Sequence, residues 1–311
     1  MEPVLAIVGP TATGKSRLAV FLAERLDGEI VSADALQAYR GLDIGTAKPS
    51  AATRRRVPHH LLDVLDPEEA FSAGEFAARA RQAVAAIQRR GRRVILAGGS
   101  GLYLRALLAG MAKLPPADAA VRAELAARLV AEGLPSLRRE LAAVDPETAR
   151  RLAPADAQRT LRALEVFHLT GRPLAGWIAE QPFGRQGLPA IRLGLTLPRA
   201  VLYDRIADRV REMIAAGWVE EVRGLRAAGV SHSAPAFQAI GYRQLLAYLA
   251  GQVSLDAAVD ATIRATRRYA KRQQTWFRGE TDITWFTGGD RAELLPVILE
   301  VLARRGWGRG S

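Results

Sequence analysis

The feature that most constrains this chain is a glycine-rich motif directly after its first apolar segment. Residues 9–16 read Gly-Pro-Thr-Ala-Thr-Gly-Lys-Ser and fit the pattern G-x-x-x-x-G-K-[ST]. Gly9 and Gly14 let the backbone turn its N–H groups inward toward an anion, and the N-terminus of a following helix adds positive charge. Lys15 supplies a cation for a terminal phosphate, and Ser16 a hydroxyl for Mg²⁺. The motif therefore predicts a P-loop that binds a diphosphate or triphosphate, for which a nucleotide kinase is the default interpretation.

The segments around the motif alternate between strand and helix patterns. Short apolar runs predict strands, and longer runs with apolar residues every three or four positions predict helices. This alternation is typical of a parallel α/β sheet flanked by helices. The predicted strands are residues 3–9, 29–34, 61–65, 93–99, 190–197 and 283–286, and the predicted helices nearest the motif are 16–23 and 76–90.

A helical insert interrupts the α/β pattern after Pro115-Pro116. Asp118 can cap a helix that runs through Val130, and Asp145 precedes a proline and an early acid that together mark a second helix start. A third helix covers residues 158–168 and ends at Gly171. We expect a P-loop core domain of residues 1–115 and 190–311, with residues 116–189 as the insert.

An acidic residue and two further glycine-rich loops are expected beside the P-loop. Asp34 ends the second predicted strand, and ligands of open parallel sheets bind beyond the carboxyl ends of the strands. Residues 41–49 and 98–103 are glycine-rich segments, and 98–103 follows a strand at the same edge. Asp34 could be a general base, a magnesium ligand or a helix cap, and ordinary turns would also account for the glycines.

The overall composition favours a polyanionic partner. The 311 residues carry a formal charge of +12, which suits nucleic acid or a phosphorylated metabolite, although arginine-rich composition alone can produce it. The hydrophobic fraction of 49% supports a folded core. Because the chain has no cysteine, disulfides, thiol nucleophiles and thiolate zinc sites are excluded. The first apolar run is too short to cross a membrane, and we expect a cytoplasmic monomer without a membrane partner.

A basic segment near the C-terminus predicts an RNA-binding face. Residues 264–278 contain six basic residues and no acid. On a helix, Arg264, Arg268, Lys271 and Arg272 fall on one face, where they could contact phosphates, while Trp276 and Phe277 could stack on unpaired bases. The alternative is a solvated helix face with both aromatic residues in the core. Arg205 and Arg209 could likewise form an ion-pair ladder with Asp204 and Asp208, or Arg209 could reach a leaving phosphate.

Taken together, these segments resemble the tRNA dimethylallyltransferases, also called tRNA isopentenyltransferases, of the bacterial type. The resemblance runs through nearly the whole chain and is most specific in Asp-Ile-Gly-Thr-Ala-Lys-Pro at residues 43–49. Its other motifs are residues 9–16, 32–41, 98–103, 158–165, 241–244 and 271–276.

The resemblance implies a reaction and a role for each motif. Such an enzyme transfers a dimethylallyl group from dimethylallyl diphosphate to the exocyclic amine of the adenosine 3′ to the tRNA anticodon, with Mg²⁺ as cofactor. Asp34 would be the general base, with Thr11 and Arg209 assisting, and the helical insert would grip the anticodon stem. The diphosphate would be held by Gly9, Pro10, Thr11, Ala12, Thr13, Gly14, Lys15, Ser16 and Arg209, with Ser16 also on the metal. The tRNA would be contacted by Asp34, Ala35, Leu36, Gln37, Ser100, Arg122, Gln158, Arg159, Thr160, Leu161, Arg162, Gln238, Gly241, Tyr242, Arg243, Lys271, Arg272, Gln273, Gln274, Thr275, Trp276, Phe277 and Arg278.

Two positions depart from the family pattern, and three other functions compete with it. Ala35 stands where serine is usual, and Leu36 stands where a polar or basic residue is common, so the resemblance does not carry over the details of base recognition at these two positions. A small-molecule P-loop kinase would leave the basic segment without a role. A transferase acting on free adenine nucleotides would not need the helical insert. A non-catalytic RNA-binding protein would not need Lys15, Ser16 and Asp34 together.

Overall fold

The fold was analysed in a computed structural model that describes residues 2–180, 187–288 and 291–307, with the side chains of residues 291–293 left aside. The chain forms two compact units, residues 1–108 with 188–311 and residues 109–187. Residues 181–186 of the expected insert, and residues 1, 289–290 and 308–311 of the expected core domain, lie outside the described residues. None of the helices in the described ranges combines the length and the apolar character that crossing a bilayer requires.

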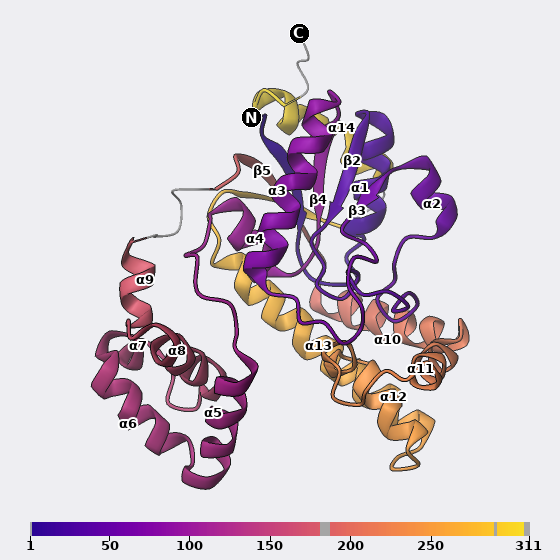
Figure 1. The fold of residues 1–311 in the computed structure, drawn as a ribbon. Helices are drawn as coiled ribbons and strands as arrows, with labels where there is room; N and C mark the ends of the chain where they lie inside the picture. The colour runs from indigo at the N-terminus through magenta and orange to yellow at the C-terminus, as the bar shows by residue number, and fades with distance from the viewer. Residues whose placement is uncertain (1, 181–186, 289–290, 308–311) are drawn as a thin grey trace. The chain divides into compact units, whose positions relative to one another are not determined.

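The first unit, here called the P-loop unit, is built on a parallel sheet of six strands in the order β3-β2-β4-β1-β5-β6 (Figure 1). This confirms the predicted α/β class. The strands are β1 (Val4–Val8), β2 (Gly28–Ser32), β3 (His59–His60), β4 (Arg93–Ala97), β5 (Ala190–Thr196) and β6 (Ile283–Thr287). The strand predicted at residues 61–65 is wrong in position, because positive φ angles of 62° at Leu61 and 55° at Asp63 break an extended strand there. Leu65 forms only an isolated parallel bridge with Tyr39.

Helices of the P-loop unit cover the sheet and extend beyond its carboxyl edge (Figure 1). The central strands are apolar because both faces are covered; all five residues of β1 are buried, for example. The helices are α1 (Lys15–Arg25), α2 (Ala51–Arg56), α3 (Ala73–Arg89), α4 (Gly101–Leu108), α10 (Arg199–Ala215), α11 (Trp218–Ala227), α12 (Tyr242–Leu249), α13 (Leu255–Arg278) and α14 (Arg291–Arg304), with a short 3-10 helix η1 at Pro235–Gln238.

The strand order places the functional loops together. β1 pairs with β4 on one side and β5 on the other, while β2 lies beyond β4. The chain leaves β1 toward β2 and leaves the adjacent strand β4 toward β5, in opposite directions, so the topological switch point where open parallel sheets bind ligands lies between β1 and β4. The P-loop follows β1, Asp34 follows β2, and the glycines of residues 98–101 follow β4. Helix α13 packs against α10 and α4 in the same unit.

The second unit, here called the helical unit, has its own apolar core. Its helices are α5 (Ala119–Glu132), α6 (Leu134–Val144), α7 (Pro146–Arg151), α8 (Ala157–Thr170) and α9 (Leu174–Glu180). The predicted caps are present: Asp118 accepts hydrogen bonds from the N–H groups of Ala120 and Val121, and Asp145 accepts one from Thr148. Leu125, Leu137, Leu141, Ala149, Ala163 and Leu164 form the buried cluster that joins these helices.

Candidate active site

The P-loop turns tightly between β1 and α1. Gly9 and Gly14 have φ angles of 130° and 95°, which side-chain-bearing residues rarely adopt. The carbonyl oxygen of Pro10 accepts hydrogen bonds from Thr13 Oγ1 at 2.9 Å and from Lys15 Nζ at 2.5 Å. Lys15 is thus folded back across the loop, and Ser16 is exposed in the first turn of α1. The motif has the predicted strand-loop-helix context.

The electrostatic surroundings of Lys15 are unusual for a lysine. Burial lowers the pKa of Lys15 to about 7, with a further lowering from the nearby charge of Arg209 and an opposing contribution from Asp34. A buried ammonium that lies near another cation is stabilised by an added anion, because the opposite charge offsets the loss of hydration and the repulsion between the cations. The loop therefore favours an anionic ligand such as a diphosphate.

Asp34 lies where the strand-end rule predicted. It is half-buried, and its Oδ1 accepts a hydrogen bond from the N–H of Leu36 at 3.0 Å. That contact forms a local turn rather than a helix cap, since no helix begins at residue 35. Within the described chain, no hydrogen bond engages Oδ2 of Asp34, so one carboxylate oxygen is free to accept a proton.

Arg209 is close enough to this carboxylate to feel its charge, and within the described residues it does not form the ion-pair ladder considered for α10. Burial lowers the pKa of Arg209, and the charge of Asp34 opposes that lowering. Its helical neighbour Asp208 pairs instead with Arg211 at 3.2 Å. Asp34, Lys15 and Arg209 therefore form one electrostatic group: an acid beside two cations.

Gln273 of α13 links the P-loop to the loop after β4. Its Oε1 accepts a hydrogen bond from Thr11 N at 2.9 Å, and its Nε2 donates to the Gly99 carbonyl at 2.9 Å. A Cβ atom on Gly99 would lie 2.1 Å from that nitrogen, so only glycine permits the contact. The side chain is 6% exposed. Gln273, predicted among the tRNA contacts, is an internal clamp in this structure.

Sequence reasoning missed Tyr269, which lies one helical turn before Gln273. Burial raises the pKa of Tyr269 to about 12, with Asp34 adding to the rise and hydrogen bonds to Ser100 and Gln273 opposing it. Ser100 Oγ also accepts a hydrogen bond from Ala35 N at 3.3 Å. The four-residue spacing from Gln273 was a signal that both side chains share the inward face of α13.

The loop of residues 43–48 is held from within the protein. Oε2 of Glu221 on α11 accepts hydrogen bonds from the N–H groups of Asp43 at 2.8 Å and Ile44 at 2.6 Å, and Oε1 accepts one from Gly45 at 3.2 Å. The hydroxyl of Tyr242 donates to Oε1 at 2.6 Å. Glu221, which the sequence analysis did not identify, therefore fills this turn.

The ordered loop in turn holds Gln37 near Asp34. Gln37 Nε2 donates to the carbonyls of Thr46 at 3.1 Å and Ala47 at 3.4 Å, and its Oε1 accepts from Ser32 Oγ at 2.9 Å. One residue, Ala33, separates Ser32 at the end of β2 from Asp34. The loop thus supports the backbone that presents the acid.

Helix α13 presents two chemically different faces. Arg264, Arg268, Lys271 and Arg272 are exposed, and none of them forms a salt bridge within the described residues. Phe277 is buried, and the indole of Trp276 lies 4.3 Å from the Arg105 guanidinium, which also pairs with Glu280. The aromatic pair therefore belongs to the packed side of the helix, as the alternative interpretation held.

The remaining predicted tRNA contacts fall in both units. In the P-loop unit Gln238 and Arg243 are exposed, whereas Gly241 and Tyr242 are buried. In the helical unit Gln158 and Arg159 are exposed and Thr160 is buried. Arg122 and Arg162 are held by the buried carboxylate of Glu165, at 2.9 Å and 2.7 Å.

Comparisons with known proteins agree with this arrangement. A family model described as IPP transferase matches residues 37–280. A tRNA dimethylallyltransferase of Halorhodospira halophila is 55% identical over 295 residues, 94% of each chain. One of Geobacter metallireducens is 52% identical over 282 residues, 91% of each chain.

Solved structures show the same similarity. A tRNA isopentenylpyrophosphate transferase of Bacillus halodurans superposes with a TM-score of 0.72 at 40% identity, covering 97% of this chain and 96% of the other. A eukaryotic dimethylallyltransferase acting on tRNA superposes with a TM-score of 0.80 at 25% identity, covering 99% of this chain and 80% of the other.

Proposed function

This chain belongs to the IPP transferase family, and from that premise we propose that it transfers a dimethylallyl group from dimethylallyl diphosphate to the exocyclic amine of the adenosine 3′ to the tRNA anticodon. The bond from the allylic carbon to the diphosphate oxygen breaks, and a bond from that carbon to the adenine nitrogen forms. Diphosphate leaves with the electron pair. The observation that carries the proposal is the group of Asp34, Lys15 and Arg209, in which a carboxylate interacts with two buried cations.

Asp34 acts as the general base. An adenine amine is a poor nucleophile because its lone pair is delocalised into the ring, so loss of its proton must accompany bond formation. The support is local: Oδ1 is occupied by the N–H of Leu36, and Oδ2 is left to accept the proton. The target base leaves its stack to reach this site, which suits an unpaired anticodon loop.

The P-loop, Lys15 and Arg209 stabilise the leaving diphosphate. Its charge increases as the carbon–oxygen bond breaks, and prearranged donors near that charge lower the barrier. Thr11 donates its N–H to Gln273, so its hydroxyl is the group that remains for substrate. Exclusion of water by the closed loops would protect the allylic diphosphate from hydrolysis.

The residues present fit a magnesium ion bound together with the diphosphate. Mg²⁺ is commonly held by one or two protein oxygens plus substrate phosphates, rather than by a complete protein cage. No cluster of three or more acidic or histidine ligands occurs among the described residues, which agrees with that mode. The Ser16 hydroxyl, exposed at the start of α1, would hold the ion, which would neutralise charge on the leaving group.

The tRNA would be bound by the exposed cations of α13 and by the helical unit, which we propose grips the anticodon stem. The exposed stripe of Arg264, Arg268 and Lys271 supports a phosphate-backbone contact, since none of the three forms a salt bridge within the described residues. The rival kinase function offers no role for this stripe.

The proposal is tested with purified protein, Mg²⁺, labelled dimethylallyl diphosphate and unmodified tRNA that carries adenosines 3′ to the anticodon. Label in the tRNA, mapped to that adenosine, is the expected result. A tRNA with guanosine at the same position is the matched control and should remain unlabelled. Absence of transfer, together with phosphate transfer from ATP to a small molecule, would instead establish the kinase function.

A further inference from the structure

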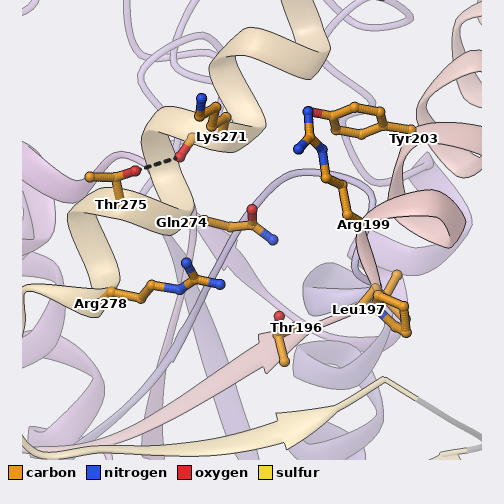
Figure 2. Close-up of a pocket in the computed structure, with 9 residues that line it drawn as sticks. Thr196, Leu197, Arg199, Tyr203, Lys271, Gln274, Thr275 and Arg278 are labelled. Carbon is orange, nitrogen blue, oxygen red and sulfur yellow. Dashed lines mark hydrogen bonds between the residues drawn. The ribbon is translucent and has the colours of Figure 1, made fainter.

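A polar cavity lies in the P-loop unit, outside the group of Asp34, Lys15 and Arg209. It has a volume of about 350 Å³ and opens between the end of β5, the start of α10 and the last turns of α13 (Figure 2). Its lining residues are Thr196, Leu197, Pro198, Arg199, Tyr203, Lys271, Gln274, Thr275 and Arg278. Leu197 also belongs to an apolar cluster that packs on Ala12 of the P-loop, so the two sites are neighbours with separate linings.

The cavity is positively charged and contains no acid. Arg199, Lys271 and Arg278 line it, and no carboxylate does. None of the three forms a salt bridge with any part of the chain that the structure describes. Figure 2 shows the side chains of Gln274 and Arg278 extending from α13 toward Thr196 and Arg199 on the opposite side. The cavity also lies at the N-terminus of α10, where Pro198 provides no side-chain cap. These features together favour an anion.

The aromatic residue of the cavity limits what that anion can be. The Tyr203 ring has the Arg199 guanidinium 5.1 Å from its centroid and the Arg267 guanidinium at 5.2 Å. With two guanidinium groups against the ring, Tyr203 offers no open platform on which a base could stack. The Thr275 hydroxyl is also engaged, because it donates to the Lys271 carbonyl at 3.1 Å. Recognition in this cavity is therefore by charge and suits a phosphate.

The exposure of the three cations of the cavity favours a phosphate within a polymer over a free phosphate. Arg199, Lys271 and Arg278 are all exposed, and isolated contacts of exposed charges are weak because water and salt screen them. Many such contacts along a polyanion add up. Lys271 continues the stripe of Arg264 and Arg268 on α13 by helical spacing. The cavity therefore stands at the end of a longer basic surface.

We propose that this cavity binds one backbone phosphate of the tRNA, held by Arg199, Lys271 and Arg278. The proposal rests on the proposed function and extends it, since it adds α10, through Arg199, to the RNA-binding surface. A free diphosphate has the same binding chemistry, and the experiment separates the two sources.

The test compares Arg199→Ala with Arg211→Ala, a matched control on the same helix whose arginine is exposed and paired with Asp208. The dissociation constant of the tRNA is measured as a function of salt. Arg199→Ala should weaken binding and reduce the slope of log K against log salt by about 1, whereas Arg211→Ala should leave the slope unchanged. Arg278→Ala, which removes no aromatic contact, should repeat the change and guards against misfolding of the first variant.

A second measurement identifies the phosphate. Anticodon stem-loops carrying one uncharged methylphosphonate linkage are tested position by position. One linkage should weaken binding to the wild-type protein and have a smaller further effect on Arg199→Ala, because that variant has already lost one of the three contacts to the same phosphate. Unchanged tRNA binding with a raised KM for dimethylallyl diphosphate would assign the cavity to a free diphosphate and overturn the proposal. No change in either would also overturn it. Failure of the wild-type protein to transfer labelled dimethylallyl groups to tRNA would instead contradict the proposed function.

Discussion

Two loops of the P-loop unit are suited to an anion, and they differ in the source of that anion. In the loop of residues 43–48 the anion is internal: the Glu221 carboxylate accepts three backbone N–H groups and the Tyr242 hydroxyl. In the P-loop, the ammonium of Lys15 is hydrogen-bonded to the uncharged Pro10 carbonyl. A loop whose backbone N–H groups donate to a carboxylate of the same chain stabilises the fold. A loop whose buried cation is hydrogen-bonded to an uncharged carbonyl is suited to bind an anionic ligand.

Substitution of Lys15 tests this difference between the two loops most strongly. We expect Lys15→Met to lower the turnover of tRNA prenylation by about 10²- to 10³-fold, because one donor to the leaving group is lost. The free energy of unfolding should stay the same or rise at neutral pH. The pKa of Lys15 in the folded protein is about 7, below the usual lysine value of 10.5, so the folded state binds its proton more weakly and Lys15 destabilises the fold at pH values below 10.5.

Both quantities are measured on the same preparation, by labelled transfer and by urea unfolding. Arg25→Met at the opposite end of α1 is the control and should leave turnover unchanged. A Lys15→Met protein that is fully active, or one that loses several kcal/mol of stability, would mean that Lys15 has a structural role like that of Glu221.

Glu221 should show the opposite response. Glu221→Gln replaces a carboxylate that accepts four hydrogen bonds with an amide that must turn an NH₂ group toward some of those donors. We expect a loss of about 2 kcal/mol in the free energy of unfolding, from weakened charge-assisted hydrogen bonds. Glu220→Gln is the matched control: its carboxylate is exposed and, among the described residues, pairs only with Arg223, and its effect should stay within about 0.5 kcal/mol.

The enzymatic activity of the Glu221→Gln protein provides a second test of this role. Because Glu221 acts through the 43–48 loop and Gln37, the Glu221→Gln protein should show a raised KM for tRNA while dimethylallyl diphosphate binding is retained. Equal stability of the two glutamine variants would contradict the view that this loop is filled from within.

Gly45 tests the packing beneath the same loop. A Cβ atom at Gly45 would lie 2.1 Å from Nε1 of the buried Trp218. Gly45→Ala should therefore cost about 1–3 kcal/mol of stability through overpacking. Gly224→Ala on α11 is the control, since nothing lies within 4 Å of its added Cβ and alanine favours a helix. Thermal unfolding of both variants measures the difference in their stability. Equal stability would mean that Trp218 moves aside without cost and would contradict the prediction.

The smallest expected effect is the pH dependence of diphosphate binding. With a pKa of about 7, Lys15 of the free protein is largely neutral at pH 8, and a bound anion should recharge it. Dimethylallyl diphosphate should then bind with uptake of close to one proton, and affinity should fall up to about tenfold per pH unit above 7. Calorimetry in buffers of different ionisation enthalpy measures the uptake. Lys15→Met should abolish it, and equal uptake by both proteins would assign the proton to another group.

Much of the fold could be predicted because its signals are local. The strands β1, β2, β4 and β5 are short apolar runs, and the P-loop lies directly between a strand and a helix. The strand-end rule was sufficient to bring Asp34 beside the loop. The misplaced third strand shows the limit of apolar patterns, since positive φ angles at Leu61 and Asp63 leave no trace in hydrophobicity.

The parts that could not be predicted depend on contacts between distant residues. Thr11 and Gln273 are 262 positions apart, and Asp43 and Glu221 are 178 apart. Nothing in the local pattern of α11 or α13 distinguishes these side chains from other polar residues on a helix. Whether a helical side chain is buried also depends on the elements that pack against the helix. For this reason Gln273 and Phe277 were predicted to face RNA, whereas in the structure they lie on the packed side of α13.

The central claim is that Asp34 removes the proton of the adenine amine next to a diphosphate held by the P-loop. Its most direct test is single-turnover transfer by Asp34→Asn with saturating tRNA and dimethylallyl diphosphate, together with the dissociation constant of the tRNA. We predict a rate lowered by about 10²- to 10⁴-fold with tRNA affinity retained, because asparagine keeps the shape and cannot accept the proton. A rate close to that of the wild-type protein would contradict the claim.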